Sequence, residues 1–340
     1  MSKKLNIAIV GATGAVGEAF ITVLEERKFP LKNLYLLASA RSVGKTALFR
    51  GKSLDIEDLA EFDFSKADIA LFSAGGDISK EYAPKAAAAG CVVIDNSSCF
   101  RYEDDIPLVV PEVNAHRIAD YKNRNIIANP NCSTIQMVVA LKPLHDKAGI
   151  TRINVATYQS VSGTGKEAIS ELVSQVGDLL NGRPAKIAVY PQQIAFNALP
   201  HIDVFEENGY TREEMKMVWE TQKIMEDKNI LVNPTAVRVP VIYGHSEAIH
   251  VEFKKPLTAA NAKSILSKAP GVKVVDNTAK AQYPTVLKDA VGRDEVFVGR
   301  IRQDLSHPNG LNLWVVADNV RKGAATNAVQ IAEILQSEYL

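Results

Sequence analysis

The sequence contains little cysteine, and its three cysteines show no pairing pattern. Cys91, Cys99 and Cys132 are an odd number with no C-x-x-C spacing. A chain of 340 residues buries enough apolar surface to fold without disulfide bonds. The cysteine content therefore excludes a disulfide-built secreted domain and predicts a reducing, cytoplasmic environment. Histidine, cysteine and aspartate also lack the spacing of a metal site, so we expect no metal.

An excess of either charge is also missing. The 39 Lys and Arg residues equal the 39 Asp and Glu residues, which gives a net charge of zero. This balance argues against a nucleic-acid partner and against a polybasic membrane anchor. No apolar run approaches the ~20 residues of a membrane span, and Ile7–Val10 is too short for a signal peptide. We therefore expect a globular enzyme or binding protein without a membrane partner.

The first 130 residues alternate short apolar runs with helical patterns. Helices are expected over Glu18–Arg27 and Ala83–Ala89, and strands over Leu5–Val10, Leu34–Ala38, Ile69–Phe72, Cys91–Ile94 and Ile126–Ala128. Buried strands that alternate with helices form right-handed βαβ units and a parallel sheet. The pattern predicts an α/β domain of the Rossmann type over residues 1–130.

After Asn129-Pro-Asn131 the pattern changes to that of an α+β domain over residues 131–320. Helices are expected over Cys132–Leu144, Lys166–Asn181, Thr211–Asp227 and Asn261–Ala269, and strands over Ile153–Tyr158, Val237–Ile242, Glu247–Phe253, Val296–Arg302 and Leu311–Ala317. Thr211 and Glu214 have the spacing of a capping box. Residues 324–340 form a further helical pattern with an apolar side, so we expect residues 321–340 to return to the first domain and complete it.

A glycine loop joins the first strand to the first helix. Its sequence is Gly11-Ala-Thr-Gly-Ala-Val-Gly17, with G-x-x-G-x-x-G spacing in place of the commoner G-x-G-x-x-G. Glycines let the backbone approach a pyrophosphate, and the helix N-terminus attracts its charge. The order strand, loop and helix favours a dinucleotide site, although a purely structural glycine turn has the same order.

The end of the second strand indicates which dinucleotide is bound. NAD-binding proteins keep an acidic residue there for the ribose 2′-hydroxyl. Here the segment reads Leu37-Ala-Ser-Ala-Arg-Ser42 and has no carboxylate. Arg41, with the hydroxyls of Ser39 and Ser42, can bind a 2′-phosphate. We therefore predict NADP rather than NAD; the alternative is that Arg41 is a solvated loop residue.

Cys132 follows a strand breaker and opens a helical pattern. A cysteine in the first turn of a helix has its thiolate stabilised by the helix dipole. A thiolate is the nucleophile that covalent acyl chemistry needs. The alternative is an inert, buried cysteine. Cys91, within an apolar strand, and Cys99 are interpreted as structural.

Two further segments carry polar groups at strand ends. Gln159-Ser-Val-Ser-Gly163 is a loop of small residues that a ligand can approach, or else a plain strand-to-helix connection. His245 follows Gly244 at a strand end, seven residues past Arg238. An imidazole titrates near neutral pH and suits acid–base catalysis. The other five histidines are interpreted as structural.

Together these motifs resemble the aspartate-semialdehyde dehydrogenase family over essentially the whole chain. The resemblance rests on the glycine loop and on Asn129-Pro-Asn-Cys-Ser-Thr134, Gln159-Ser-Val-Ser-Gly163, the segment from Arg238 to Gly-His-Ser-Glu247, and Gly292-Arg-Asp-Glu-Val-Phe-Val-Gly-Arg300. It implies a Rossmann domain, a glyceraldehyde-phosphate-dehydrogenase-like C-terminal domain and a homodimer.

The resemblance also implies a reaction. L-Aspartate 4-semialdehyde, phosphate and NADP⁺ interconvert with 4-phospho-L-aspartate and NADPH, and cells use the reductive direction. The step leads to lysine through diaminopimelate, and to threonine, methionine and isoleucine.

Site residues follow from the same resemblance. Cys132 would form a thioester, His245 would act as acid and base, and Gln159 would orient the acyl group. Arg238 would clamp the substrate carboxylate and Glu220 its amine, while Arg101 and Lys223 would hold phosphate. The NADP-binding residues would be Gly11, Thr13, Gly14, Ala15, Val16, Ser39, Arg41, Ser42, Ser73, Ser162, Gly163 and Asn319. Without the resemblance, Glu220 and Lys223 would be interpreted as a surface ion pair on one helix face, and Arg101 as a solvated arginine.

Two alternative functions remain open on the sequence. N-acetyl-gamma-glutamyl-phosphate reductase performs similar chemistry, but its substrate amine is acetylated and has no need of Glu220. A non-catalytic NADP-binding protein has no reason to combine Cys132, Gln159, Arg238 and His245.

Overall fold

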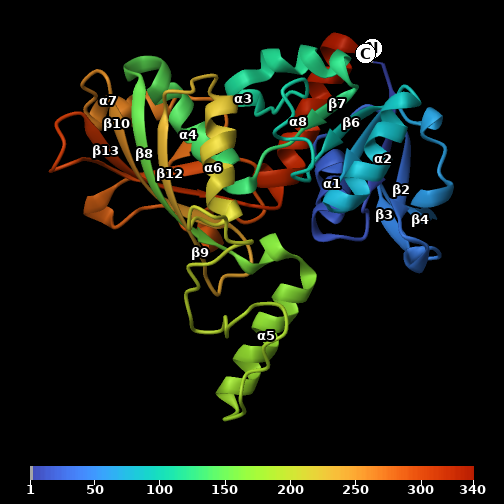
Figure 1. The fold of residues 1–340 in the computed structure, drawn as a ribbon, viewed down its shortest axis with the longest axis horizontal. Coiled ribbons are helices and arrows are strands. Elements are labelled where there is room, and N and C mark those ends of the chain that lie inside the picture. Colours follow the sequence, from blue (N-terminus) through green and yellow to red (C-terminus); the bar gives the residue numbers. More distant parts are fainter. Residues whose placement is uncertain (1–2) are drawn as a thin grey trace. The chain divides into compact units, whose positions relative to one another are not determined.

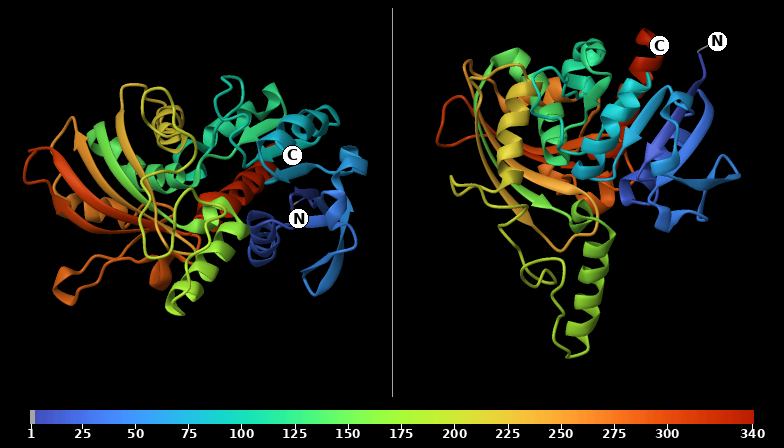
Figure 2. Two further views of the ribbon diagram at one scale, coloured as in Figure 1. Left: turned by 60° about the horizontal axis from the view of Figure 1, so that its bottom comes forward. Right: turned by 45° about the vertical axis from the view of Figure 1, so that its right-hand side comes forward.

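The computed structural model describes residues 3–340, which divide into two compact units. The first contains the chain up to Asn131 together with Ala324–Leu340, and the second contains Cys132–Gly323. The start and the end of the described chain meet on the first unit, where the Lys3 side chain donates to the Leu340 carbonyl at 3.0 Å (Figure 2). The second unit is therefore inserted into the first.

The first unit is built on a seven-stranded sheet in the order β3-β4-β2-β1-β5-β6-β7. The strands are β1 (Leu5–Val10), β2 (Leu31–Ala38), β3 (Thr46–Phe49), β4 (Lys52–Asp58), β5 (Ile69–Phe72), β6 (Val92–Asp95) and β7 (Ile126–Ala128). All neighbours are parallel except β3 and β4. Consecutive residues of β1 and β5 are buried, as expected of strands covered on both faces. The predicted parallel sheet is confirmed.

The helices of the first unit are α1 (Ala15–Glu26), α2 (Gly76–Ala88), α3 (Pro111–Asn114) and α8 (Thr326–Ile334). The first and the last of these share one core, although they are far apart in the sequence. Phe20 and Leu24 of α1 lie in one apolar cluster with Val329 and Ile331 of α8 (Figure 1). The C-terminal helix therefore returns to the Rossmann-type unit, as predicted.

The β3–β4 hairpin was not expected from the sequence. Its turn places Arg50 and Gly51 at positive φ, 49° and 74°. β4 has only a short alternating pattern, in which Leu54 and Ile56 are flanked by polar residues, and this weak strand signal was missed.

The second unit has a six-stranded sheet in the order β11-β12-β13-β10-β8-β9. Its strands are β8 (Ile150–Gln159), β9 (Leu231–Arg238), β10 (His245–Phe253), β11 (Val272–Val274), β12 (Val296–Gln303) and β13 (Gly310–Ala317). The helices α4 (Cys132–Ala148), α6 (Arg212–Ile224) and α7 (Ala259–Leu266) pack on one face of this sheet, while α5 (Lys166–Leu180) extends away from it (Figure 1).

The strands of this unit alternate as the sequence predicts. In β10 the side chains of Ile249 and Val251 are buried under the helices, while Ala248 and His250 on the other face are half-buried. An antiparallel sheet covered on one face requires this pattern. The capping box of α6 is also present, because Thr211 and Glu214 each bond the other's backbone N–H.

The strand expected over Val237–Ile242 was placed too late in the chain. The structure ends β9 at Arg238 and starts it at Leu231. Pro234 lies inside the strand, which is tolerated because β9 is at the edge of the sheet. Residues 239–244 contain Pro240 and leave the sheet as a loop.

Within residues 3–340, no helix has both the length and the apolar character needed to cross a membrane. The same described residues contain no group of three potential metal ligands close enough to hold an ion.

Candidate active site

The predicted nucleophile and the predicted acid–base residue lie side by side. Cys132 is the first residue of α4, and His245 is the first residue of β10. The distance between Cys132 Sγ and His245 Nε2 is 3.2 Å. Gly323 packs against this point, because a Cβ there would be 2.8 Å from the Cys132 Cβ. The position of Cys132 at a helix N-terminus is confirmed, and it favours a thiolate.

The surroundings of His245 determine where its proton lies. The backbone N–H of Ser160 points at His245 Nδ1 over 3.1 Å. An N–H can only donate, so Nδ1 must be the acceptor and the proton of the neutral ring is on Nε2, facing the sulfur. Complete burial, assisted by the Arg238 charge, lowers the pKa of His245 to about 3. At neutral pH the ring is therefore a neutral hydrogen-bond donor to Cys132.

Gln159, at the end of β8, is held by two acceptors. Its Nε2 donates to Ser133 Oγ at 2.6 Å and to Glu213 Oε1 at 2.9 Å. Ser133 directly follows Cys132 in α4, and Glu213 lies in the first turn of α6. Gln159 Oε1 is buried and has no partner among the described residues. The Gln159 amide thus links β8 to α4 and α6, and its carbonyl oxygen is available to accept a hydrogen bond from a ligand.

Arg238 ends β9 beside Gln159, with which it is in register. Its Nη1 donates to the Ser160 carbonyl at 2.6 Å, while its Nε is buried without a partner among the described residues. Gly163 packs closely here, because a Cβ at this position would be 3.2 Å from Arg238 Nη1. A buried guanidinium with an unused donor suits a carboxylate ligand.

Asn319, Ser160 and Ser162 form a buried hydrogen-bonded group behind His245. The Asn319 Oδ1 accepts from the hydroxyls of Ser160 and Ser162, at 3.1 and 3.2 Å, and from the Gly244 N–H at 2.8 Å. These bonds tie the small-residue loop to the start of β10. They hold the loop that was predicted to approach a ligand.

The other residues predicted to bind the substrate are less exposed than charged side chains usually are. Glu220 is fully buried, and Lys223 is half-buried three residues later in α6. Arg101 belongs to the first unit, is only 6% exposed and donates to the Asn96 carbonyl at 2.9 Å. The interpretations of a surface ion pair and of a solvated arginine are therefore wrong.

The first unit contains a pocket of about 620 Å³ at the glycine loop. Its lining includes Gly11, Thr13, Gly14, Ser39, Arg41 and Ser73 from the predicted set. Ala15 and Val16 open α1, and Ser42 ends a short 3₁₀ turn, but none of the three lines this pocket. The glycines are necessary, since a Cβ at Gly11 would be 3.0 Å from the Ser73 backbone.

Several lining and supporting residues were missed from the sequence. Asp58 and Tyr82 line the pocket of the first unit. In the second unit, Glu213 accepts a hydrogen bond from the Gln159 amide and pairs with Lys216. One signal existed: Glu213, Met217 and Glu220 have the spacing of a single helix face, and Met217 is apolar. Both glutamates therefore belong to the buried stripe of α6.

The other cysteines differ from Cys132. Cys91 is fully buried, and burial raises the pKa of its thiol to about 12. Such a thiol is inert at neutral pH. The interpretation of Cys91 as a core residue is confirmed.

Comparisons with known proteins define the class of this chain. The semialdehyde dehydrogenase NAD binding domain matches residues 6–121, and the semialdehyde dehydrogenase dimerisation domain matches residues 141–322. The two domains of the chain are accordingly those of a semialdehyde dehydrogenase.

Similar whole proteins identify the family. An aspartate-semialdehyde dehydrogenase from Legionella pneumophila is 78% identical over 340 residues, covering 100% of this chain and 98% of that protein. The crystal structure of aspartate semialdehyde dehydrogenase II from Vibrio cholerae, complexed with ASA, has a TM-score of 0.98 at 60% identity and covers 100% of both chains. The enzyme from Candida albicans, solved with NADP, has a TM-score of 0.78 at 26% identity, covering 98% of this chain and 99% of that one.

The chain belongs to the aspartate-semialdehyde dehydrogenases, the NADP-dependent phosphorylating oxidoreductases of amino-acid biosynthesis. This result sets aside the two alternative functions, the N-acetyl-gamma-glutamyl-phosphate reductase and the non-catalytic binding protein.

Proposed function

We propose that this chain converts 4-phospho-L-aspartate to L-aspartate 4-semialdehyde through a thioester on Cys132. The observation that carries the proposal is the 3.2 Å contact between Cys132 Sγ and a neutral His245 at the N-terminus of α4. The thiolate attacks the acyl carbon, the C–S bond forms, and phosphate leaves with the electron pair of the C–O bond.

His245 and Gln159 both support this chemistry. The Nε2–H of His245 faces the sulfur, so it stabilises the negative charge on Sγ before attack and again when the C–S bond breaks. Gln159 lies next to Arg238 and orients the acyl group. Backbone N–H groups at the start of α4 are candidate donors to an oxyanion.

The first unit supplies the groups that would hold NADP. The pocket at Gly11, Thr13 and Gly14 offers close backbone approach, and Ser39 and Arg41 would bind the 2′-phosphate. Ser73 lines the same pocket, Ala15, Val16 and Ser42 would contact NADP from outside its lining, and Ser162, Gly163 and Asn319 would face the nicotinamide. When bound, NADPH supplies the hydride that reduces the thioester.

The substrate carries an anionic α-carboxylate, a cationic amine and an acyl phosphate. The unused Nε of Arg238 suits the carboxylate, and Glu220 suits the amine. Arg101 and Lys223 would bind phosphate. Two arginines and a lysine for two anions, with one glutamate for the amine, match the charges of the substrate.

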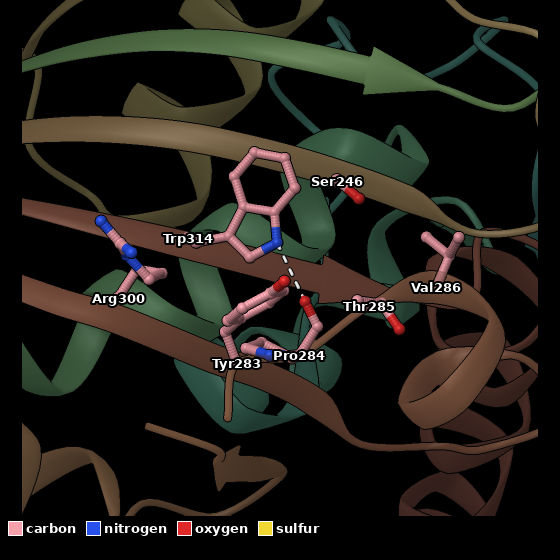
Figure 3. A pocket seen from close by; sticks show the side chains of 7 residues that line it. All are labelled: Ser246, Tyr283, Pro284, Thr285, Val286, Arg300 and Trp314. Atoms are coloured by element: carbon pink, nitrogen blue, oxygen red, sulfur yellow. Dashed lines mark hydrogen bonds between the residues drawn. The ribbon is translucent and has the colours of Figure 1, made fainter. Parts of the chain in front are cut away.

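We propose that the protein is a homodimer that pairs through the open face of the six-stranded sheet. The helices cover only the opposite face. Figure 3 shows Trp314 on this open face, with its indole N–H donating to the Pro284 carbonyl at 3.1 Å beside a pocket of about 440 Å³. Tyr283, 46% exposed, lines the same pocket. Sedimentation of Trp314→Asp tests this surface, because a charge there should give monomers.

A reducing cytoplasm is the proposed compartment. Cys91, Cys99 and Cys132 are all free thiols in the structure. The nucleophile must stay reduced for the reaction to proceed.

The direct test is phosphate-dependent NADPH formation from aspartate semialdehyde and NADP⁺. Absorbance at the NADPH band should rise only when phosphate is present. Substituting NAD⁺ should raise the Michaelis constant for the coenzyme. Turnover without phosphate would contradict the proposed acyl-phosphate chemistry, and a clear preference for NAD⁺ would contradict the role of Arg41.

A further inference from the structure

A buried carboxyl group follows the Cys132–His245 pair along β10. Glu247 ends the motif Gly-His-Ser-Glu247 and is the third residue of this strand. Its side chain is on the same face of the sheet as that of His245, because residues two apart in a strand point the same way. Glu247 is fully buried, and neither of its carboxyl oxygens has a hydrogen bond of normal length and angle among the described residues. Burying a polar group in this way costs free energy, so an apolar residue would fill the space better.

Gln136 is the side chain that faces this carboxyl group. It lies four residues after Cys132 in α4, so both are on one face of the helix. Burial raises the pKa of Glu247 well above its usual value, and the nearby Gln136 amide lowers it only in part. The Gln136 side chain is itself fully buried, and neither its amide nitrogen nor its amide oxygen has a complete hydrogen bond among the described residues. Two buried polar groups therefore face each other between α4 and β10.

The two contacts between α4 and β10 have matching spacing. Four residues of a helix advance by about 6 Å, and two residues of a strand advance by about 6.6 Å. Gln136 and Glu247 therefore meet one step after Cys132 and His245, whose Sγ and Nε2 atoms are 3.2 Å apart. A link at the second contact fixes how α4 lies along β10, and so it also fixes the distance at the first.

The surroundings of Glu247 favour the uncharged acid. Its neighbours in register are Thr157 on β8 and Val315 on β13, and neither carries a charge. A protonated carboxyl group has one donor and one acceptor, and a primary amide has the complementary pair, so two hydrogen bonds can join them in a ring. An ionised carboxylate only accepts, and it would place a second negative charge near the Cys132 thiolate.

We propose that Glu247 is a positioning residue that acts as an uncharged acid and, paired with the Gln136 amide, holds His245 against the sulfur of Cys132. The pair is a second link between α4 and β10, and it sets the approach of Nε2–H to Sγ through the two elements. The inference rests on the proposed function, because the contact that it maintains is the one that keeps Cys132 reactive there.

Glu247→Leu tests the link, because it removes both hydrogen bonds and nearly keeps the volume. His245 is then held less exactly, so alkylation of Cys132 by iodoacetamide at pH 7 should slow at least about fivefold. Mass spectrometry of the Cys132 peptide measures this rate in the full-length protein. In the phosphate-dependent assay kcat should fall at least about tenfold, while the KM for NADP⁺ should not change.

Glu247→Gln is the conservative variant that should rescue the site. A glutamine can form the same two hydrogen bonds with Gln136, so the alkylation rate and kcat should return to within about threefold of the wild-type values. An unchanged alkylation rate in Glu247→Leu would show that the side chain only fills space. Failure of Glu247→Gln to restore the rate would show that the working form is charged. Either result overturns the proposal.

Thr157→Val is the matched control. It removes another buried polar group, a hydroxyl without a hydrogen-bond partner among the described residues, which is in register with Glu247 but lies on β8. Because the link between α4 and β10 stays intact, alkylation and turnover should stay at the wild-type level. A loss equal to that of Glu247→Leu would indicate that any polar group in this region matters, and it would overturn the proposal.

A double-mutant cycle gives a second, independent outcome. Gln136→Leu removes the other half of the link and should slow alkylation as much as Glu247→Leu does. The double variant should be no slower than either single variant, because both residues act through one contact, and additive losses would overturn the proposal. If Glu247→Leu does not fold, Gln136→Leu tests the link by itself, and an unchanged rate there overturns it. Alkylation needs no substrate, so an absence of phosphate-dependent activity in the wild-type protein would contradict the proposed function and not this link.

Discussion

The nucleotide pocket and the catalytic centre are built in opposite ways. In the first unit the critical residues have no side chain: a Cβ at Gly17 would lie 2.1 Å from the Gly11 carbonyl oxygen, and one at Gly11 would meet the Ser73 backbone at 3.0 Å. In the second unit the site is formed by buried polar side chains, and hydrogen bonds hold Gln159 and His245 in place. The pocket is sensitive to added atoms, whereas the centre is sensitive to removed ones.

This contrast separates binding from chemistry within one chain. Backbone N–H groups and small residues suit a large cofactor that every turnover exchanges. A nucleophile and its donor need exact distances, which only packed and hydrogen-bonded side chains maintain. Substitutions in the two places should therefore fail differently.

The largest effect is expected for a substitution of Cys132, which should abolish catalysis and leave the nucleotide pocket unchanged. Cys132→Ser should lower kcat at least about a thousandfold, because a serine hydroxyl is not ionised there. NADPH affinity, measured by fluorescence titration, should stay within about twofold. Cys99→Ser is the control and should keep its turnover. Near-normal turnover of Cys132→Ser would remove this residue as the nucleophile.

Gly17→Ala tests the nucleotide pocket instead, because it adds one methyl group to the glycine loop. The new Cβ collides with the backbone of Gly11 and Ala12, so we expect a loss of unfolding free energy of about 2–3 kcal/mol and weaker NADPH binding. Gly177→Ala is the matched control in α5. A Cβ there meets nothing within 4 Å, and it should stabilise the protein by about 0.5–1 kcal/mol. Equal thermal denaturation of the two variants would contradict the close approach.

Arg238→Lys sharpens the comparison, because it keeps the positive charge and removes the planar arrangement of donors that a guanidinium has. Lysine lacks the planar fork, so kcat/KM for aspartate semialdehyde should fall about a hundredfold, while the KM for NADP⁺ should not change. Arg183→Lys, at an exposed ion pair with Asp178, serves as control. An unchanged kcat/KM in Arg238→Lys would refute the carboxylate clamp.

The smallest effect concerns Glu247, a buried residue two positions after His245. Burial raises its pKa well above the ordinary value of 4.5, and Gln136 opposes this only in part. A raised pKa in the folded state gives stability below pH 4.5 that is lost as pH rises through the folded value. Glu247→Gln removes this loss, so its gain in unfolding free energy over the wild type should grow from pH 5 to pH 8, by about 1.4 kcal/mol per pH unit at most.

Urea unfolding at several pH values measures this gain. Glu252→Gln lies on the half-exposed face of the same strand and should show no such trend. A gain for Glu247→Gln that is the same at every pH would show that the carboxyl is already ionised in the folded protein.

Most of the fold was predictable because its strands have strong local signals. β1, β5 and β7 begin and end where the apolar runs predict. The errors have physical causes. Pro234 argues against a strand at β9, which tolerates a proline only because it is an edge strand. In β4 only Leu54 and Ile56 are apolar, so its alternating pattern is short and weak.

The site was predictable only where residue type indicates chemistry. Cys132 and His245 were paired through the family resemblance, and the structure places them together. Glu213 was missed because a glutamate on an amphipathic helix is normally solvated, and its burial depends on strands far away in sequence. The assignments of individual residues to substrate, phosphate and cofactor stay predictions.

The insertion of one unit into the other sets an order for biosynthesis. Val329, Ile331 and Leu335 complete the core of the first unit, yet ribosomes make these residues only after the whole second unit. The second unit is continuous and can fold as it emerges, whereas the Rossmann-type unit must wait until Ala324–Leu340 has been made. Until then the apolar side chains of α1 lack their partners in α8, so removal of Ala324–Leu340 should destabilise the first unit more than the length removed suggests.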